Sequence, residues 1–435
     1  MRVAVIGTGI AGNSAAWALA RSPHVSKLCV YEKDGRTGGH SATVTIDYDG
    51  TPIAVDTGFI VYNELNYPNL TALFKAIDVE TLASDMSFAF SLDRGRFEWC
   101  GSTTAVINSL FAQRRNIASP RYLKMLVEIV RFNRVSVDDH RNGRLAGLSL
   151  GQYISGRGFS DYFRDRYIVP MGAAIWSTPA NDMLQFTAEN FIAFFDNHKL
   201  LQWERPIWRT VAGGSRQYVD KLTTSFRDRI RTDTPVIRIT RSQDNVLVED
   251  ANGGAERFDH VVIAAHSDQA LAMLGDPSAR EHELLSSVRY RPNTVYLHRD
   301  PALMPKRRRA WAAWNFLKDG DDGDRDATVS YWMNALQGID KSKPLFVTLN
   351  PKEPPAPHLT FGVYSYAHPQ FNGPAFRAQR ELDTIQGRNR TWFCGAWTGY
   401  GFHEDGLASG LSVAESLGAR IPWRSEIEHF EQAAE

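Results

Sequence analysis

The sequence predicts an α/β protein in which a parallel-sheet domain is interrupted twice by a second, α+β domain. A chain of 435 residues is too long for one ordinary hydrophobic core. Its first residues, "RVAVIG", form a β-branched run of the kind found in buried parallel strands. Similar apolar runs, "HVVIAAH" and "TWFCGAW", return much later in the chain. One sheet is therefore expected to collect strands from distant segments.

Composition argues against several classes of protein. The 49 basic and 49 acidic side chains cancel, so no nucleic acid partner is expected. The three cysteines are far apart and the 12 histidines show no ligand spacing, so neither a disulfide framework nor a metal site is predicted. No run of 18 apolar residues predicts a membrane-spanning helix. These features predict a cytoplasmic location and leave the oligomeric state open.

The first strand runs into a glycine turn with the spacing of a dinucleotide-binding unit. Gly7 permits the tight turn, Gly9 lets the backbone approach a pyrophosphate, and Gly12 lets the following helix pack close to the strand. A second strand, "KLCVYEK", ends in Glu32, where an acid would bind a ribose hydroxyl. The unit is therefore predicted to be Rossmann-like, and its cofactor-binding residues are predicted to be Gly7, Gly9, Ala11, Gly12, Asn13, Glu32 and Lys33.

The next residues, "EKDGRTGGH", resemble an extension of this motif in flavoproteins of the amine oxidase, protoporphyrinogen oxidase and phytoene desaturase superfamily. Arg36, Gly38 and Gly39 match the pattern, and His40 stands where the family usually has Arg. The resemblance implies a non-covalently bound FAD in a Rossmann-like domain of the glutathione-reductase type. Further residues that it assigns to the cofactor are Gly58, Phe59, Val236, Gly395, Ala396, Gly406 and Leu407.

The stretch "FCGAWTGYGFHEDGLASG" near the C-terminus resembles the superfamily's second flavin motif. Many relatives carry Asp after the strand glycine, but Ala396 and Trp397 follow it here. The polar contact is therefore expected either to be absent or to come from Glu404 or Asp405. The N-terminus of the following helix would stabilise negative charge on the reduced flavin.

Domain boundaries follow from these motifs and from the pattern between them. Residues 1–65, 205–285 and 388–435 are predicted to form the FAD-binding domain. Residues 66–204, a helical insertion, and 286–387 are predicted to form the discontinuous substrate domain. In the second insertion "TVYLHRD", "AAWNFL", "TVSYWMNAL" and "LFVTLNP" predict strands, which resemble the antiparallel sheet over the superfamily's substrate cavity.

Three segments, "GGHSATV", "DTGFIVYNELNYPN" and "HEDGLASG", resemble a bacterial branch of the superfamily. This branch includes the flavin-dependent desaturase of methylated fatty acids in furan fatty acid synthesis. The resemblance implies desaturation of an acyl chain within a membrane phospholipid, with a hydride passing to flavin N5 and a proton to a base. The candidates for this base or for positioning the substrate are Asp56, Tyr62, Tyr331 and His403. Each also has an ordinary structural interpretation, as a turn residue or a core aromatic.

Other functions stay open at the level of sequence. An amine oxidase commonly has Lys near flavin N5, but Asn293 and Thr294 occupy the corresponding place, which disfavours an amine without excluding it. A carotenoid- or prenyl-type desaturase is a second alternative. A non-catalytic flavin-binding module that associates with membranes is a third.

Two segments combine basic and apolar side chains. They are "QRRNIASPRYLKMLVEIVRFNRV", residues 113–135, and "MPKRRRAWAAW", residues 304–314. Such segments suit an anionic membrane surface, although a solvated basic face over a core helix has the same composition. The membrane interpretation predicts a lipid or fatty acyl partner and a peripheral place on the inner face of the cytoplasmic membrane.

Overall fold

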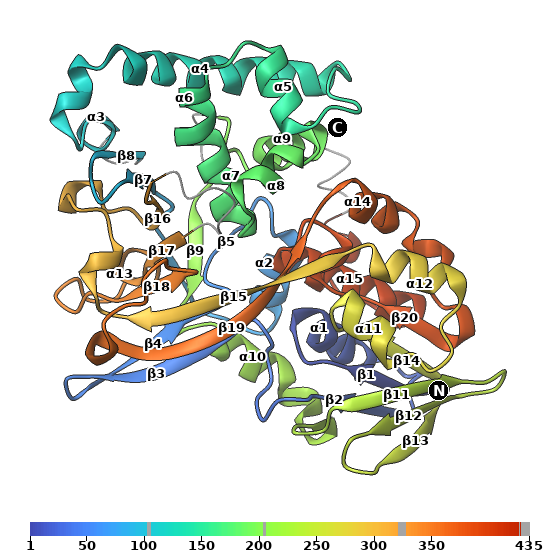
Figure 1. The fold of residues 1–435 in the computed structure, drawn as a ribbon. Coiled ribbons are helices and arrows are strands. Elements are labelled where there is room, and N and C mark those ends of the chain that lie inside the picture. The colour runs from blue at the N-terminus through green and yellow to red at the C-terminus, as the bar shows by residue number, and fades with distance from the viewer. Residues whose placement is uncertain (102–105, 203–205, 321–327, 426, 428–435) are drawn as a thin grey trace.

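The computed structural model describes residues 1–101, 106–202, 206–320, 328–425 and 427. Figure 1 shows a parallel sheet with its helices at the lower right, a group of helices at the top and a larger sheet at the left. The parallel sheet has five strands, in the order β10 (Ile230–Arg231), β2 (Lys27–Tyr31), β1 (Arg2–Ile6), β14 (His260–Ile263) and β20 (Thr391–Phe393). Its strands thus come from distant segments, as the sequence predicts.

Two helices from opposite ends of the chain pack together beside this sheet. α1 (Ile10–Leu19) follows β1, and α15 (His403–Ser416) follows β20. Every residue of α1 is buried, because the helix lies between the sheet and α15. Further helices of this half are α2 (Pro68–Ala76), α10 (Arg216–Thr223), α11 (Ser267–Met273), α12 (Ala279–Ser286) and α14 (Gly373–Arg380).

The larger sheet has seven strands. Their order is β19 (Thr360–Gln370), β15 (Arg289–His298), β18 (Phe346–Leu349), β17 (Thr328–Trp332), β16 (Trp314–Lys318), β7 (Phe88–Leu92) and β8 (Phe97–Gly101). In Figure 1, β15 and β19 extend from this sheet across the middle of the molecule towards α14 and α15. The short helix α13 (Met333–Leu336) follows β17 directly.

The helical insertion contains α3 (Val106–Leu110), α4 (Pro120–Arg141), α5 (Leu150–Gly156), α6 (Asp161–Phe163), α7 (Val169–Trp176), α8 (Ala180–Gln185) and α9 (Ala188–Asn197). A π-helical turn, Arg164–Ile168, joins α6 to α7, and a 3-10 turn, Arg114–Ala118, precedes α4. Its core is aromatic and includes Phe132, Phe163, Phe191 and Phe195, each fully buried.

Smaller sheets complete the fold. β3 (Thr43–Tyr48) and β4 (Thr51–Asp56) form a hairpin, and β11 (Val236–Arg241), β12 (Val246–Asp250) and β13 (Ala255–Phe258) form an antiparallel sheet. The third is formed by β5 (Tyr62–Asn63), β9 (Trp208–Val211) and β6 (Thr81–Ala83).

The predicted substrate sheet needs two corrections. It is mixed rather than antiparallel, because β16 pairs in parallel with β7. The segment "TVSYWMNAL" is also not one strand, because it ends as α13. In addition, β7 and β8 lie within the insertion that was expected to be helical. The domain boundaries stay a prediction, and the one between residues 204 and 205 lies outside the described residues.

Candidate active site

The first glycine turn has the geometry that its spacing predicts. Gly7 has a φ of +99°, and a Cβ at Gly12 would lie 1.9 Å from the Gly7 carbonyl oxygen. At Gly9, by contrast, an added Cβ would meet no protein atom within 4 Å. α1 begins immediately after Gly9 and has no side-chain cap, although its first residues are buried. Uncapped N–H groups beside open space are what a pyrophosphate needs.

Glu32 and Asn13 hold this turn in place. The Glu32 carboxylate accepts hydrogen bonds from the Thr8 N–H (2.9 Å), the Thr8 hydroxyl and the Asp34 N–H (3.0 Å). The Asn13 amide donates to the Thr8 carbonyl (2.7 Å). Of the other residues predicted here, Ala11 is buried against α15 and Lys33 is exposed. Both oxygens of Glu32 therefore brace the turn, and the ribose contact expected from the sequence stays a prediction.

The second glycine pair lies directly against the first turn. The Gly38 N–H donates to the Thr8 carbonyl (3.0 Å), and a Cβ at Gly39 would lie 3.0 Å from the Gly9 Cα. Both glycines have a positive φ, +110° and +57°. Arg36 donates from Nη2 to the Gly39 carbonyl (2.8 Å). The backbone of Gly38 and Gly39 thus lies directly against the backbone of Thr8 and Gly9. This close approach explains why the flavoprotein motif has glycine at positions 38 and 39.

His40 belongs to a cluster of aromatic rings that the sequence motifs do not predict. Its ring centroid lies 5.1 Å from Tyr366, 5.8 Å from His368 and 6.1 Å from His266. Burial lowers the pKa of His40 to about 4, that of His266 to about 4 and that of His368 to about 3. All three imidazoles are therefore neutral at pH 7. Among the described residues, no group of His, Cys, Asp and Glu side chains is placed to hold a metal ion.

Tyr366 and His368 come from β19, which was not among the predicted strands. The alternation in "TFGVYSYAHPQ" is the signal that could have identified them, because Tyr364, Tyr366 and His368 share one face of the strand. The Tyr366 hydroxyl also hydrogen-bonds the Thr57 hydroxyl (2.8 Å), which ties β19 to the loop after β4.

Asp56 ends β4 and is fully engaged by neighbouring donors. Its carboxylate accepts from the Thr43 hydroxyl (2.6 Å), the Ser215 N–H (2.9 Å) and hydroxyl (2.8 Å), and the Gln337 amide (3.0 Å). Burial raises its pKa to about 6, against the effect of these hydrogen bonds. Because both oxygens are used, the geometry favours Asp56 as a brace between three segments over Asp56 as the catalytic base.

His403 is the predicted catalytic residue with the most directed surroundings. Its ring stacks on Phe59, with centroids 3.8 Å apart. Its Nε2 hydrogen-bonds the Tyr218 hydroxyl (2.6 Å) and the Ser41 hydroxyl (3.2 Å), which also bond each other. Burial, with a smaller effect of His40, lowers its pKa to about 3. His403 is thus a neutral, oriented imidazole, and its Nδ1 has no hydrogen-bond partner within the part of the chain that the structure describes.

Phe59 itself is held by the glycine before it. The Phe59 N–H donates to the His40 carbonyl (2.8 Å), and a Cβ at Gly58 would lie only 2.1 Å from that oxygen. The segments around residues 40 and 58, both predicted to contact the cofactor, therefore lie together.

The C-terminal turn meets the first glycine turn through α1 and α15. A Cβ at Gly410 would lie 2.1 Å from the Ala11 carbonyl oxygen, and the Ser14 hydroxyl donates to the Leu407 carbonyl (3.3 Å). A Cβ at Gly406 would lie 3.5 Å from the Ala396 nitrogen. The two glycine turns at opposite ends of the chain are therefore adjacent in space.

The acids of the C-terminal turn bind their own chain. Glu404 accepts from the Asn69 N–H (2.9 Å) and the Leu70 N–H (3.0 Å), so it caps α2. Asp405 accepts from the Phe402 N–H (2.8 Å), and burial raises its pKa to about 7. Trp397 donates to the Ala265 carbonyl (3.1 Å). Of the two possibilities left by the sequence, the absence of an acidic contact to the cofactor is therefore favoured.

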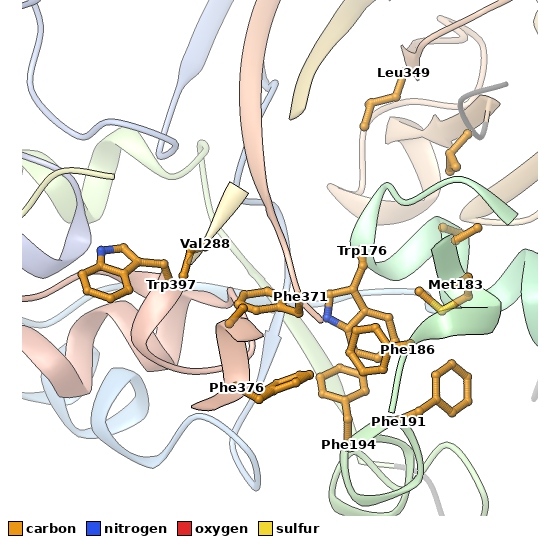
Figure 2. Close-up of a cluster of buried hydrophobic side chains, with 14 of the residues drawn as sticks. Trp176, Met183, Phe186, Phe191, Phe194, Val288, Leu349, Phe371, Phe376 and Trp397 are labelled. Carbon is orange, nitrogen blue, oxygen red and sulfur yellow. The ribbon is translucent and has the colours of Figure 1, made fainter. Parts of the chain in front are cut away.

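The aromatic residues of this turn pack against the helical insertion. Phe402 stacks on Phe194 of α9, with centroids 4.9 Å apart, and Tyr400 lies 5.8 Å from the same ring. The Trp176 indole donates to the Tyr400 carbonyl (3.3 Å). Figure 2 shows Trp176, Phe186 and Phe194 of the insertion close to Phe371 and Phe376. An apolar aromatic wall therefore connects the second glycine turn to α7–α9.

The remaining predicted residues have ordinary surroundings. Tyr62 is a core residue, packed edge-on against Phe74 at 5.2 Å. Tyr331 is buried beside Trp314, with ring centroids 4.8 Å apart. Val236 begins β11 and pairs with Asp250. No hydrogen bond distinguishes Tyr62 or Tyr331 among the described residues, and their catalytic role stays a prediction.

The fold and the glycine-lined cradle define a dinucleotide-binding enzyme with a substrate domain inserted into it. A family model described as flavin containing amine oxidoreductase matches residues 10–334, and the chain belongs to this family. It is therefore an FAD-dependent oxidoreductase. Among the curated proteins none matches it.

Solved structures of similar fold cover both amines and fatty acids. Wild-type putrescine oxidase bound to putrescine is 14% identical, with a TM-score of 0.67 over 96% of this chain and 99% of that one. The CLA-producing fatty acid isomerase from P. acnes is 13% identical, with a TM-score of 0.67 over 95% and 98%. Cyclohexylamine oxidase from Brevibacterium oxydans IH-35A is 15% identical, with a TM-score of 0.66 over 96% and 99%. These likenesses show the fold alone.

The residues present fit FAD. The open space at Gly9 and the uncapped start of α1 suit its diphosphate, and the Gly38–Gly39 loop closes over the same turn. The start of α15, where His403 stacks on Phe59, packs against the start of α1 and suits the flavin end. Bound there, FAD supplies a hydride acceptor at flavin N5.

Proposed function

We propose that this enzyme desaturates fatty acyl chains of membrane phospholipids, with methylated or unsaturated chains as the substrate class. A hydride leaves the chain for the flavin, and a proton leaves the adjacent position for a protein base. The observation that carries the proposal is the aromatic wall that joins the C-terminal turn to α7–α9. Phe402 and Tyr400 of this wall are only partly buried, so their rings are available to an apolar chain.

A second observation disfavours an amine. Asn293 and Thr294 occupy the place where the family resemblance predicts Lys, and Asn293 is completely buried. Its amide donates to the Tyr366 carbonyl (3.3 Å), and its oxygen accepts from Asn350 (2.7 Å). This position therefore supports β15 and β19 and provides no basic group beside the flavin. One protein of similar fold is named a fatty acid isomerase, which is compatible with an acyl substrate.

His403 is assigned as the proton acceptor. A neutral imidazole is able to accept a proton, and the stack on Phe59 fixes its plane. The Tyr218 and Ser41 hydroxyls hold Nε2, which leaves Nδ1 to take the proton. Burial lowers the pKa of His403 to about 3, so the imidazole is neutral at pH 7 and has a nitrogen lone pair that can accept a proton.

Anaerobic reduction of the bound flavin tests the substrate class. Detergent-dispersed phospholipids with unsaturated or methylated chains are expected to bleach the visible flavin absorbance, whereas saturated chains are expected to do so much more slowly. Putrescine and cyclohexylamine serve as matched amine probes. Rapid bleaching by either amine, with none by any lipid, would contradict the proposal and favour amine oxidation.

A further inference from the structure

The outer face of the helical insertion carries an unusual group of exposed apolar side chains. Among the described residues, half of the exposed large hydrophobic side chains lie between residues 107 and 130. They are Ile107 of α3, Ile117 of the following 3-10 turn, and Leu123, Val127 and Val130 of α4. Ile107 is 73% exposed and Val127 is 68% exposed. These exposed side chains are thus concentrated on three consecutive elements of the chain.

The spacing within α4 shows that this exposure belongs to one side of the helix. Positions 123, 127 and 130 follow one another at intervals of four and three residues, so they lie on a single face. The opposite face is buried and includes Met125 and Phe132. The helix is therefore apolar on its core side and also on part of its outer side. In Figure 1, α4 lies along the top edge of the molecule, with α3 at one end.

Basic side chains border the apolar stripe. Between residues 114 and 137 every exposed charged side chain is basic, namely Arg114, Arg115, Arg121, Lys124, Arg131 and Arg134. The one acid in this range, Glu128, is turned inward and accepts hydrogen bonds from the N–H (2.9 Å) and hydroxyl (2.5 Å) of Ser160. The face is therefore locally cationic although the whole chain is neutral.

The second basic segment of the sequence meets the same face. The 3-10 turn Arg308–Ala310 contacts α3, and Arg309 lines a surface hollow together with Asn108 and Arg114. The tryptophans of this segment do not join the apolar stripe. Trp311 is only partly exposed, lies under the Arg308 guanidinium at 3.8 Å and packs on Phe346 at 5.3 Å. The segment thus adds cations, while the apolar contacts come from α3 and α4.

We propose that this face, Ile107 to Arg134 with Arg308 and Arg309, docks the enzyme on an anionic lipid bilayer. The inference rests on the proposed function, because a phospholipid substrate has to be reached at the membrane. Apolar side chains bordered by Arg and Lys complement a surface that presents phosphates above acyl chains. Among the described residues, no helix has the length and apolar character to cross a bilayer.

Vesicle sedimentation with the FAD-loaded full chain tests the surface. At low salt the enzyme is expected to bind vesicles of phosphatidylcholine and phosphatidylglycerol and to bind pure phosphatidylcholine vesicles at least about tenfold more weakly. The triple variant L123S/V127S/V130S is expected to lower binding to the anionic vesicles by about tenfold or more. Its matched control is L65S/L82S/V363S, which removes three apolar side chains that are exposed on other elements. The control is expected to bind like the unmodified enzyme.

Each outcome decides the proposal. Loss of binding only in the α4 variant, with its flavin content unchanged, supports the docking face. Equal binding by both triple variants, or salt-sensitive binding that survives L123S/V127S/V130S, would mean a purely electrostatic surface and would overturn it. Bleaching by detergent-dispersed phospholipid without vesicle binding would overturn the proposed docking face and leave the proposed function standing. Vesicle binding without bleaching by any lipid would overturn the proposed function and leave the surface standing.

Discussion

The two glycine turns of this enzyme are adjacent in space but are built on different physical principles. In the first, contacts are made by backbone, since Gly12 lies under the Gly7 carbonyl and Gly39 lies against Gly9. In the second, side chains dominate, because Phe402 and His403 insert between other segments. The first turn is therefore shaped by backbone contacts that require glycine, and the side chains of Glu32 and Asn13 brace it. The second turn is shaped by the side chains that pack against it, Phe194 on Phe402 and Phe59 on His403.

This difference predicts how each turn responds to substitution. Adding a methyl group at Gly12 of the first turn has to displace backbone, whereas one at Gly9 meets no protein atom within 4 Å. Changing a side chain of the second alters chemistry while leaving the fold in place.

Gly12→Ala is expected to abolish FAD binding and to destabilise or unfold the protein. The new Cβ would lie 1.9 Å from the Gly7 oxygen, so α1 would have to move away from the turn. Overpacking of this kind costs about 3 kcal/mol or more. Flavin absorbance of the purified protein and its thermal unfolding measure both effects. A stable, yellow Gly12→Ala protein would show that the cradle is not close-packed.

His403→Gln is expected to slow anaerobic flavin bleaching by about a hundredfold or more while FAD stays bound, because a proton acceptor is lost. Gln keeps a group that can bond the Tyr218 hydroxyl, so the turn is expected to stay folded. Stopped-flow absorbance gives the rate of bleaching, and the flavin content serves as the control. Asp56→Asn is the variant to compare with His403→Gln. If Asp56→Asn stays folded and loses more of the bleaching rate than His403→Gln, Asp56 is the proton acceptor instead of His403.

Stability is expected to fall as the pH drops from about 6.5 towards 3. The folded pKa of His368 is about 3, below the ordinary value of 6.5, so the unfolded chain binds the proton more readily. Its contribution is complete above pH 6.5 and is lost on acidification. Asp56, whose pKa is raised to about 6, works in the opposite direction and offsets part of the loss. Urea unfolding of His368→Gln is expected to give a shallower pH profile. Parallel profiles would contradict the burial of this imidazole.

Gly9→Ala is expected to have the smallest effect on the protein itself. Its φ of −64° is ordinary for Ala and no protein atom lies within 4 Å of the added Cβ. The free energy of unfolding without cofactor is therefore expected to change by less than about 1 kcal/mol. FAD affinity is expected to fall by about tenfold, since that open space is assigned to the diphosphate. Unchanged affinity would place the cofactor elsewhere.

The comparison also explains how far the sequence could predict the structure. The parallel sheet and the first turn depend on local features, a β-branched run and fixed glycine spacing, and both are confirmed. β19 was missed because "TFGVYSYAHPQ" becomes a strand through its pairing with β15, about 70 residues earlier in the chain. Tyr366 and His368 were missed with it. The insertion was expected to be helical, yet β7 joins the seven-stranded sheet through β16, more than 200 residues away.

Side-chain roles were harder to predict than backbone roles. The sequence shows the same Asp at position 56 whether its carboxylate is a catalytic base or a structural brace. The four hydrogen bonds that this carboxylate accepts are what favour the structural role. The basic helix was recognisable from the sequence, but which of its apolar residues face outward depends on the core beneath it. Leu123, Val127 and Val130 are identified by their exposure alone.

The most direct test of the proposed desaturation is the mass of the acyl chain after one anaerobic turnover. The enzyme is mixed with a phospholipid carrying a methylated, unsaturated chain, and bleaching of the flavin and the mass of the released fatty acid are measured together. Desaturation predicts that the chain loses two hydrogen atoms for each flavin that is bleached. An unchanged mass with shifted double bonds and an oxidised flavin would contradict desaturation and indicate isomerisation.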